Sequence, residues 1–337
     1  MTDISMIEAA AQRLAGHVRV TPLLNAPLLD RIAGRRIFVK AECLQLTGSF
    51  KFRGGWSAVS ALAPKVRARG VIAFSSGNHA QGVALAAQLH NAPAVILMPD
   101  DTPAVKITNT HAYGAEVVLY NRATADRDAI GSDIARQRGF TLIRPYDEPQ
   151  VIAGQGTAGL EIAAQAAEQG IATADVITCC GGGGLTAGIA LALQARAPNL
   201  RVRPCEPAGF DDMARSLASG HIERNQAMTG SICDAIVTPQ PGTITFPIIQ
   251  RLCGPGLVVS DDQALHAMAL AFAHLRIVLE PGGAVALAAA LFCDDLPETV
   301  ICTASGGNVD PELFQDVLAR FTTEKVAFCK DLRQLIL

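Results

Sequence analysis

A lysine set between glycines is the residue of this sequence with the clearest chemical potential. Lys51 lies in the stretch TGSFKFRGG at 47–55, directly after a strand-like run at 36–40. At the start of a helix the dipole disfavours an ammonium ion, and a neutral lysine amine is a nucleophile that forms Schiff bases with aldehydes. The glycines would let a planar group approach the backbone. Taken alone, however, a surface lysine on a glycine-rich turn is the simpler interpretation.

Four consecutive glycines at 181–184 follow a strand-like run at 175–178 and open a helical pattern that starts at Leu185. Such a turn exposes successive backbone N–H groups at the positive end of a helix, which is where proteins bind phosphate. A tight turn alone would need only one or two glycines. The pattern therefore favours an anion site, and the absence of a Walker lysine argues against a nucleoside triphosphate.

The same glycines also match a dinucleotide fingerprint. Gly182-x-Gly184-x-x-Ala187 follows a strand, and Glu206 ends the next one; a weaker match lies at 154–159. On these residues alone a nicotinamide dinucleotide and a monophosphate cofactor are equally supported. An NAD-dependent oxidoreductase is thus one alternative, although it gives Lys51 no function.

A cluster of polar residues follows another strand-like run. Ser75, Ser76, Asn78 and His79 surround a glycine between a strand-like run at 71–74 and a helical pattern. Hydroxyls, an amide and free N–H groups in this position can hold a carboxylate, and one serine could transfer protons, although one such residue could be an ordinary helix cap.

Ser305 ends the last strand-like run, and its hydroxyl could bond a ring nitrogen without protonating it, although an ordinary strand-ending turn would look the same. Glu206 and Asp212 flank a turn that contains Phe210, a spacing of oxygen ligands that suits Mg²⁺ or Ca²⁺. The acidic residues equally suit a helix N-terminus.

Composition narrows the protein class. The net charge of −3 with scattered Lys and Arg argues against a nucleic-acid partner. The nine cysteines form an odd number without CxxC spacing, which favours reduced thiols and a cytoplasmic protein. No signal peptide or membrane-spanning run is apparent.

Short apolar runs alternate with helical patterns along the whole chain, which is typical of parallel βαβ units. We expect an α/β fold with two parallel sheets: a large domain formed by residues 1–51 and 146–337, and a small domain formed by residues 52–145. One helix is expected at 157–169. A cleft between the two domains is the expected ligand site.

Taken together, these motifs resemble the fold type II pyridoxal-phosphate (PLP) enzymes, the tryptophan synthase beta-like fold, and within them the serine/threonine dehydratase and serine racemase group. The resemblance covers residues 18–320 approximately and holds the motifs in the expected order. It implies that Lys51 carries the cofactor as a Schiff base and that Ser76 is the acid/base on the opposite face.

The resemblance also implies the other binding residues. Phe50, Asn78, Gly181, Gly182, Gly183, Gly184 and Ser305 would bind the cofactor; Ser75, Ser76, Asn78 and His79 would bind substrate; and Glu206, Phe210 and Asp212 would bind a divalent cation.

The implied reaction is β-elimination of water and then loss of ammonia from a 3-hydroxy amino acid, which gives a 2-oxo acid. Serine or threonine is the leading expected substrate. Arg127 matches an arginine of the racemase-like branch and could pair with the second carboxylate of 3-hydroxyaspartate, although a solvated helix face explains it as well. An amino-acid racemase on the same scaffold is a further alternative, and a hydroxyectoine-pathway substrate stays open. The family further implies a homodimer.

Overall fold

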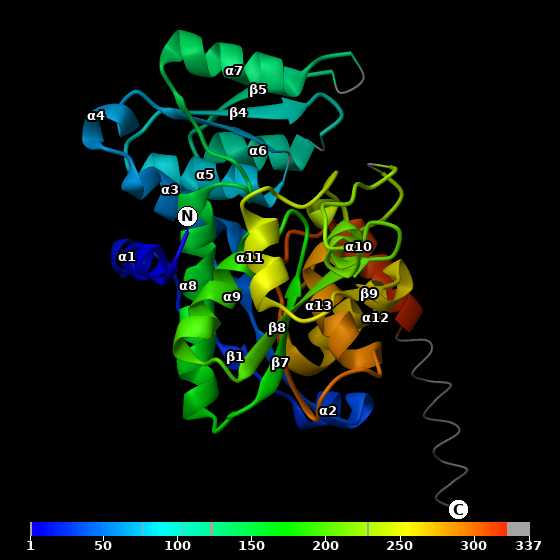
Figure 1. Ribbon diagram of the computed structural model, residues 1–337. Helices are drawn as coiled ribbons and strands as arrows, with labels where there is room; N and C mark the ends of the chain where they lie inside the picture. The colour runs from blue at the N-terminus through cyan, green and yellow to red at the C-terminus, as the bar shows by residue number, and fades with distance from the viewer. Residues whose placement is uncertain (1, 76, 103, 122–123, 228, 322–337) are drawn as a thin grey trace, which may run out of the picture.

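The computed structural model describes residues 2–75, 77–102, 104–121, 124–227 and 229–321. Its described strands form two sheets (Figure 1). The six-stranded sheet has the order β1 (Leu23–Leu24), β2 (Arg36–Lys40), β10 (Thr299–Thr303), β7 (Ala174–Cys179), β8 (Leu200–Pro207) and β9 (Leu257–Val259). The four-stranded sheet has the order β5 (Glu116–Tyr120), β4 (Ala94–Pro99), β3 (Val71–Phe74) and β6 (Thr141–Leu142).

All strand pairs between these elements are parallel except β1 with β2. The expected α/β class with two parallel sheets is therefore confirmed. The boundaries of the two domains at residues 51/52 and 145/146 stay a prediction.

Helices cover both faces of each sheet (Figure 1). Around the smaller sheet lie α3 (Lys51–Ala61), α4 (Pro64–Arg67), α5 (Asn78–Leu89), α6 (Ala104–Ala112) and α7 (Arg127–Arg138). Around the larger sheet lie α1 (Ile4–Leu14), α2 (Pro27–Ala33), α8 (Pro149–Glu168), α9 (Gly184–Arg196), α10 (Asp212–Ser219), α11 (Thr245–Leu252), α12 (Asp261–Leu270) and α13 (Pro281–Phe292), and residues 311–321 are also helical. No helix among the described residues is long and apolar enough to cross a membrane.

Strand register brings the functional segments together. Thr303 of β10 pairs with Lys40 of β2, so the segments that follow these two strands leave the sheet at the same edge. Beyond the strands, Ser49 and Gly306 form an isolated bridge, and the Phe50 N–H donates to the Ser305 carbonyl over 3.1 Å. The lysine segment and the Ser305 segment, far apart in sequence, are therefore held side by side.

The helix expected at 157–169 begins eight residues earlier, at Pro149. Proline suits the first turn of a helix, and the Glu148 carboxylate accepts the N–H groups of Gln150 and Val151. The weaker glycine fingerprint at 154–159 consequently lies inside α8 and not at a strand-to-helix turn. A Cβ on Gly154 would lie 2.3 Å from the Arg53 carbonyl, so this glycine permits close packing of α8 on α3.

A buried network of charges ties α3 to the large sheet. Arg53, two residues after Lys51, donates to Glu42 and to Glu161, each over 2.7 Å, and Lys40 donates to Glu161 over 2.5 Å. The side chains of Lys40, Glu42 and Arg53 are fully buried. Although burial alone would lower it, the pKa of Arg53 is raised because both carboxylates favour the charged guanidinium. This network fixes the start of α3, and hence the backbone of Lys51.

Candidate active site

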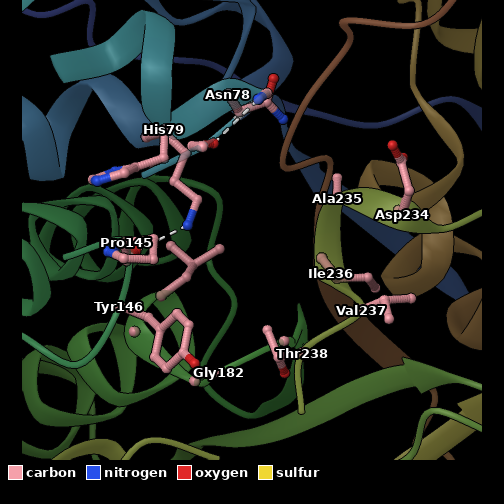
Figure 2. A pocket seen from close by; sticks show the side chains of 18 of the residues that line it. Asn78, His79, Pro145, Tyr146, Gly182, Asp234, Ala235, Ile236, Val237 and Thr238 are labelled. Atoms are coloured by element: carbon pink, nitrogen blue, oxygen red, sulfur yellow. Dashed lines mark hydrogen bonds between the residues drawn. The ribbon is translucent and has the colours of Figure 1, made fainter. Parts of the chain in front are cut away.

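A cavity of about 620 Å³ lies where the two sheets meet, and segments from both of them line it. In Figure 2, Pro145 and Tyr146 form one wall, and the segment from Asp234 to Thr238 faces them across the space. The volume suits a ligand of cofactor size. The expected cleft is thus present.

Lys51 is the first residue of α3, and its amine lies in this cavity. The Nζ atom donates a hydrogen bond to the Pro145 carbonyl over 2.9 Å and lies 5.1 Å from the centre of the Phe50 ring. Burial lowers the pKa of Lys51 to about 8, against the opposing effect of the Glu280 carboxylate. A substantial fraction of the amine is therefore neutral near pH 8, as attack on an aldehyde requires.

The glycine turn lies on the cavity wall, between β7 and α9. Gly183 has φ +93°, which favours glycine, and a Cβ on Gly182 would meet the Tyr146 ring at 2.2 Å. The turn carries no side chains of its own, so its backbone lines the cavity at the N-terminus of α9, beside the Tyr146 ring. This arrangement fits a phosphate group.

Asn78, the first residue of α5, is held by one residue just before α13 and one residue after β10, both from segments that adjoin the larger sheet. Its Nδ2 donates to Glu280 Oε1 over 2.5 Å, and its Oδ1 accepts from Asn308 Nδ2 over 2.6 Å. Burial raises the pKa of Glu280 to about 7. One Asn78 amide hydrogen stays available for a ligand, since Nδ2 carries two.

The other residues expected to contact substrate, Ser75 and His79, differ in the contacts that their side chains make. Ser75 lines the cavity, and its hydroxyl accepts the Gly77 N–H over 3.1 Å. The His79 imidazole is buried and bonds the Ile143 carbonyl over 2.9 Å, and burial lowers its pKa to about 3. Its Nε2 is thereby used in a structural contact, whereas Nδ1 has no hydrogen-bond partner among the described residues. The N-terminal N–H groups of α5 are further groups that can bind a carboxylate.

The side chains of two predicted site residues lie outside the described part of the chain. Ser76 lies outside the described residues. Arg127 is the first residue of α7, but its side chain lies outside the described part of the chain.

Phe50 and Ser305, which were expected at the cofactor ring, are buried and line the cavity. Neither residue offers a charge. A neutral hydroxyl at Ser305 would leave a facing ring nitrogen unprotonated.

The acidic residues predicted as metal ligands are absent from the lining of this cavity: Glu206 lies at the end of β8, and Asp212 begins α10. The Glu206 carboxylate accepts the N–H groups of Met213 and Ala214 over 3.0 and 2.8 Å. Glu206 therefore caps a helix and is buried, which leaves it unsuited to a ribose hydroxyl. Burial and the nearby Asp212 charge raise the pKa of Glu206 well above its usual range.

Sequence reasoning missed several residues of the site. Pro145, which accepts from Lys51, contributes a backbone carbonyl, and any residue type has one. Glu280 and Asn308 hold the Asn78 side chain by hydrogen bonds, and they are 202 and 230 residues away from it in sequence. Asn308 could have been found from its position, because it directly follows Gly307 in the Ser305 motif. Glu280 has no comparable signal in the sequence.

Comparison with known proteins defines the class. Residues 14–306 match the family model described as "Pyridoxal-phosphate dependent enzyme". The chain belongs to this family, and its fold is that of the fold type II PLP enzymes. The nicotinamide alternative is thereby overturned, since the family cofactor is PLP.

Individual relatives lie within one group of that family. The chain is 42% identical to an L-threo-3-hydroxyaspartate ammonia-lyase from Pseudomonas sp., over 92% of this chain and 96% of that protein. It is 36% identical to a serine racemase from Oryza sativa subsp. indica, over 91% of both chains. A crystal structure of a threonine deaminase from T.th. matches with a TM-score of 0.86 and 43% identity, over 91% of this chain and 99% of that one.

Proposed function

We propose that this protein is a PLP-dependent ammonia-lyase that converts a 3-hydroxy amino acid to a 2-oxo acid and ammonia. The observation that carries the proposal is the amine of Lys51, which lies in a cavity of about 620 Å³ with its pKa lowered to about 8. Relatives named ammonia-lyases and threonine deaminase support the reaction type.

The residues of the site fit the stages of that reaction. When bound, PLP supplies an aldehyde that attaches to amines and a ring that withdraws electrons from the substrate α-carbon. The neutral Lys51 amine can accept the α-proton, and the N-terminus of α5 can hold the substrate carboxylate. Loss of the β-hydroxyl as water gives an enamine, whose imine tautomer takes up water and releases ammonia.

Cations around the cavity favour a substrate with a second carboxylate. Lys106 of α6, Arg144 and Arg224 all line it. Lys106 Nζ lies 3.8 Å from Asp234 Oδ2, so an ion pair links α6 to the segment at 234–238. We propose Lys106 and Arg127 as partners of that carboxylate in 3-hydroxyaspartate, with serine and threonine as poorer substrates.

Release of 2-oxo acid from L-serine, L-threonine and both 3-hydroxyaspartate diastereomers tests the substrate. We expect L-threo-3-hydroxyaspartate to have the highest kcat/KM. Because a hydrogen bond to a charged group contributes about 1.5–3 kcal/mol, Lys106→Met should lower that value about ten- to a hundredfold while affecting serine little. Arg127→Ala should act in the same direction.

Lys65→Met, on α4 and outside the cavity lining, is the matched control and should change neither substrate. Equal losses with serine and hydroxyaspartate would contradict the proposed substrate. The relatives named serine racemases also favour racemisation as a second candidate activity. Chiral analysis of the unreacted amino acid separates the two, because only racemisation produces the mirror-image amino acid.

We also propose a divalent cation, Mg²⁺ or Ca²⁺, at Glu206, Asp212 and the Phe210 carbonyl. Asp212 Oδ2 is buried and has no hydrogen-bond partner among the described residues. A buried carboxylate oxygen without a partner is costly, and a cation would compensate for it. The donor set, two carboxylates and a carbonyl, consists of the hard oxygen ligands that these cations prefer.

Thermal unfolding with and without Ca²⁺ or Mg²⁺ tests this cation site. A cation at about 100 times its Kd should add about 2.7 kcal/mol to the free energy of unfolding. We expect this gain in the wild type and in Asp211→Asn, whose carboxylate faces Arg215 at 3.6 Å. Asp212→Asn should abolish it. A gain that survives in Asp212→Asn would contradict the site.

Two broader proposals concern the protein as a whole. The eight cysteines within the described residues all carry free thiols, which supports a cytoplasmic protein. A homodimer is proposed from the family resemblance.

A further inference from the structure

One buried side chain at the cavity forms no hydrogen bond to any residue that the structure describes. Gln155, in the second turn of α8, is fully buried and lines the cavity. Neither its Nε2 nor its Oε1 has a hydrogen-bond partner among the described residues. An unpaired buried amide is costly, and such a group in a folded protein needs an explanation.

The position of this amide indicates what it is for. Gln155 Oε1 lies 2.6 Å from the point where a Cβ on Gly184 would stand, and Nε2 lies 3.0 Å from the corresponding point on Gly54. Gly184 begins α9 at the glycine turn, and Gly54 lies one helical turn after Lys51 on α3. The amide therefore lies between α3, which starts at Lys51, and α9, which starts at the glycine turn.

We propose that Gln155 is a side-chain hydrogen-bond donor to the cofactor's phosphate group, in addition to the backbone N–H groups of the turn. The inference rests on the proposed placement of that phosphate at Gly181–Gly184. Rotation of the amide by 180° exchanges its oxygen and nitrogen, so the NH₂ group can face Gly184. A phosphate oxygen there would give the amide the partner that it lacks.

This assignment predicts opposite effects on the empty and the loaded protein. Gln155→Met removes a buried polar group that has no partner within the described part of the chain, so the melting temperature of the apoprotein should rise. The same substitution should weaken the binding of PLP about ten- to a hundredfold, the range for a hydrogen bond to a charged group. A glutamine with only a structural role would instead lower the stability of the apoprotein.

The decisive experiment compares PLP with pyridoxal, which has the same aldehyde and no phosphate. Dissociation constants for both compounds, and for inorganic phosphate alone, are measured by titrating apoprotein of the wild type and Gln155→Met. We expect weaker binding of PLP and phosphate and unchanged binding of pyridoxal. Gln165→Met is the matched control: it lies on the same helix, and its amide already donates to the Thr21 carbonyl over 2.9 Å. That control should leave the PLP-to-pyridoxal ratio unchanged.

Two results would overturn the inference: equal weakening of PLP and pyridoxal in Gln155→Met, or a lower melting temperature of its apoprotein. Failure of the underlying phosphate placement would look different. In that case Gly183→Ala, which strains a φ of +93°, would leave the PLP-to-pyridoxal ratio of the otherwise wild-type protein unchanged.

Discussion

Lys51→Ala is expected to abolish release of 2-oxo acid and to remove the visible absorbance of the purified protein. The predicted loss in kcat is at least about a thousandfold, because one substitution removes both the covalent attachment point and the base nearest the substrate. The absorbance and a 2-oxo acid assay on the same preparation measure the two effects together.

Lys65→Ala serves as the control, because this lysine lies on α4, outside the cavity lining. It should retain both the absorbance and the activity. A Lys51→Ala protein that keeps wild-type turnover would show that another group does this chemistry. The base would then have to be sought elsewhere.

Arg53→Met should produce the largest loss of stability. Removing the guanidinium leaves Glu42 and Glu161 without their shared partner in a buried site, and breaking a buried ion pair in this way costs about 3–5 kcal/mol. Chemical denaturation followed by the fluorescence of Trp56, the only tryptophan, measures the loss. The same substitution should also weaken PLP binding, because α3 begins at Lys51.

An exposed pair provides the comparison. Arg138 bonds Glu116 at the surface through two hydrogen bonds, and Arg138→Met should change the unfolding midpoint little. Adding Glu42→Gln to Arg53→Met should recover part of the lost stability, since one uncompensated charge disappears. If Arg53→Met were as stable as Arg138→Met, the buried network would not be what holds α3.

Sequence patterns predicted the fold well because each strand or helix is indicated by the residues within it. The predicted strands at 36–40, 71–74 and 116–120 have the same bounds as β2, β3 and β5. The start of α8 was missed because its cap is a glutamate followed by proline, and the glycines inside the helix matched the dinucleotide fingerprint. Their packing against α3 is a tertiary effect that no local pattern reveals.

The site was predicted where motifs carry chemistry and missed where contacts join distant segments. Lys51 and the glycine turn could be found, since each has a distinctive pattern next to a strand. Glu280 and Gln155 could not, because a glutamate before a proline and a glutamine inside a helix have no distinguishing local signal. His79 was marked by its motif as a substrate-binding residue, and this stays a prediction: its Nε2 bonds the Ile143 carbonyl, a contact that the motif did not reveal.

Peptide mapping of the borohydride-reduced protein tests the central claim most directly. Reduction fixes the cofactor to the amine that carries it, and mass spectrometry of a digest then identifies that amine. We expect a phosphopyridoxyl group on the peptide containing Lys51 and on no other lysine peptide. The same group on a different lysine, in a protein that still releases ammonia from its substrate, would contradict it.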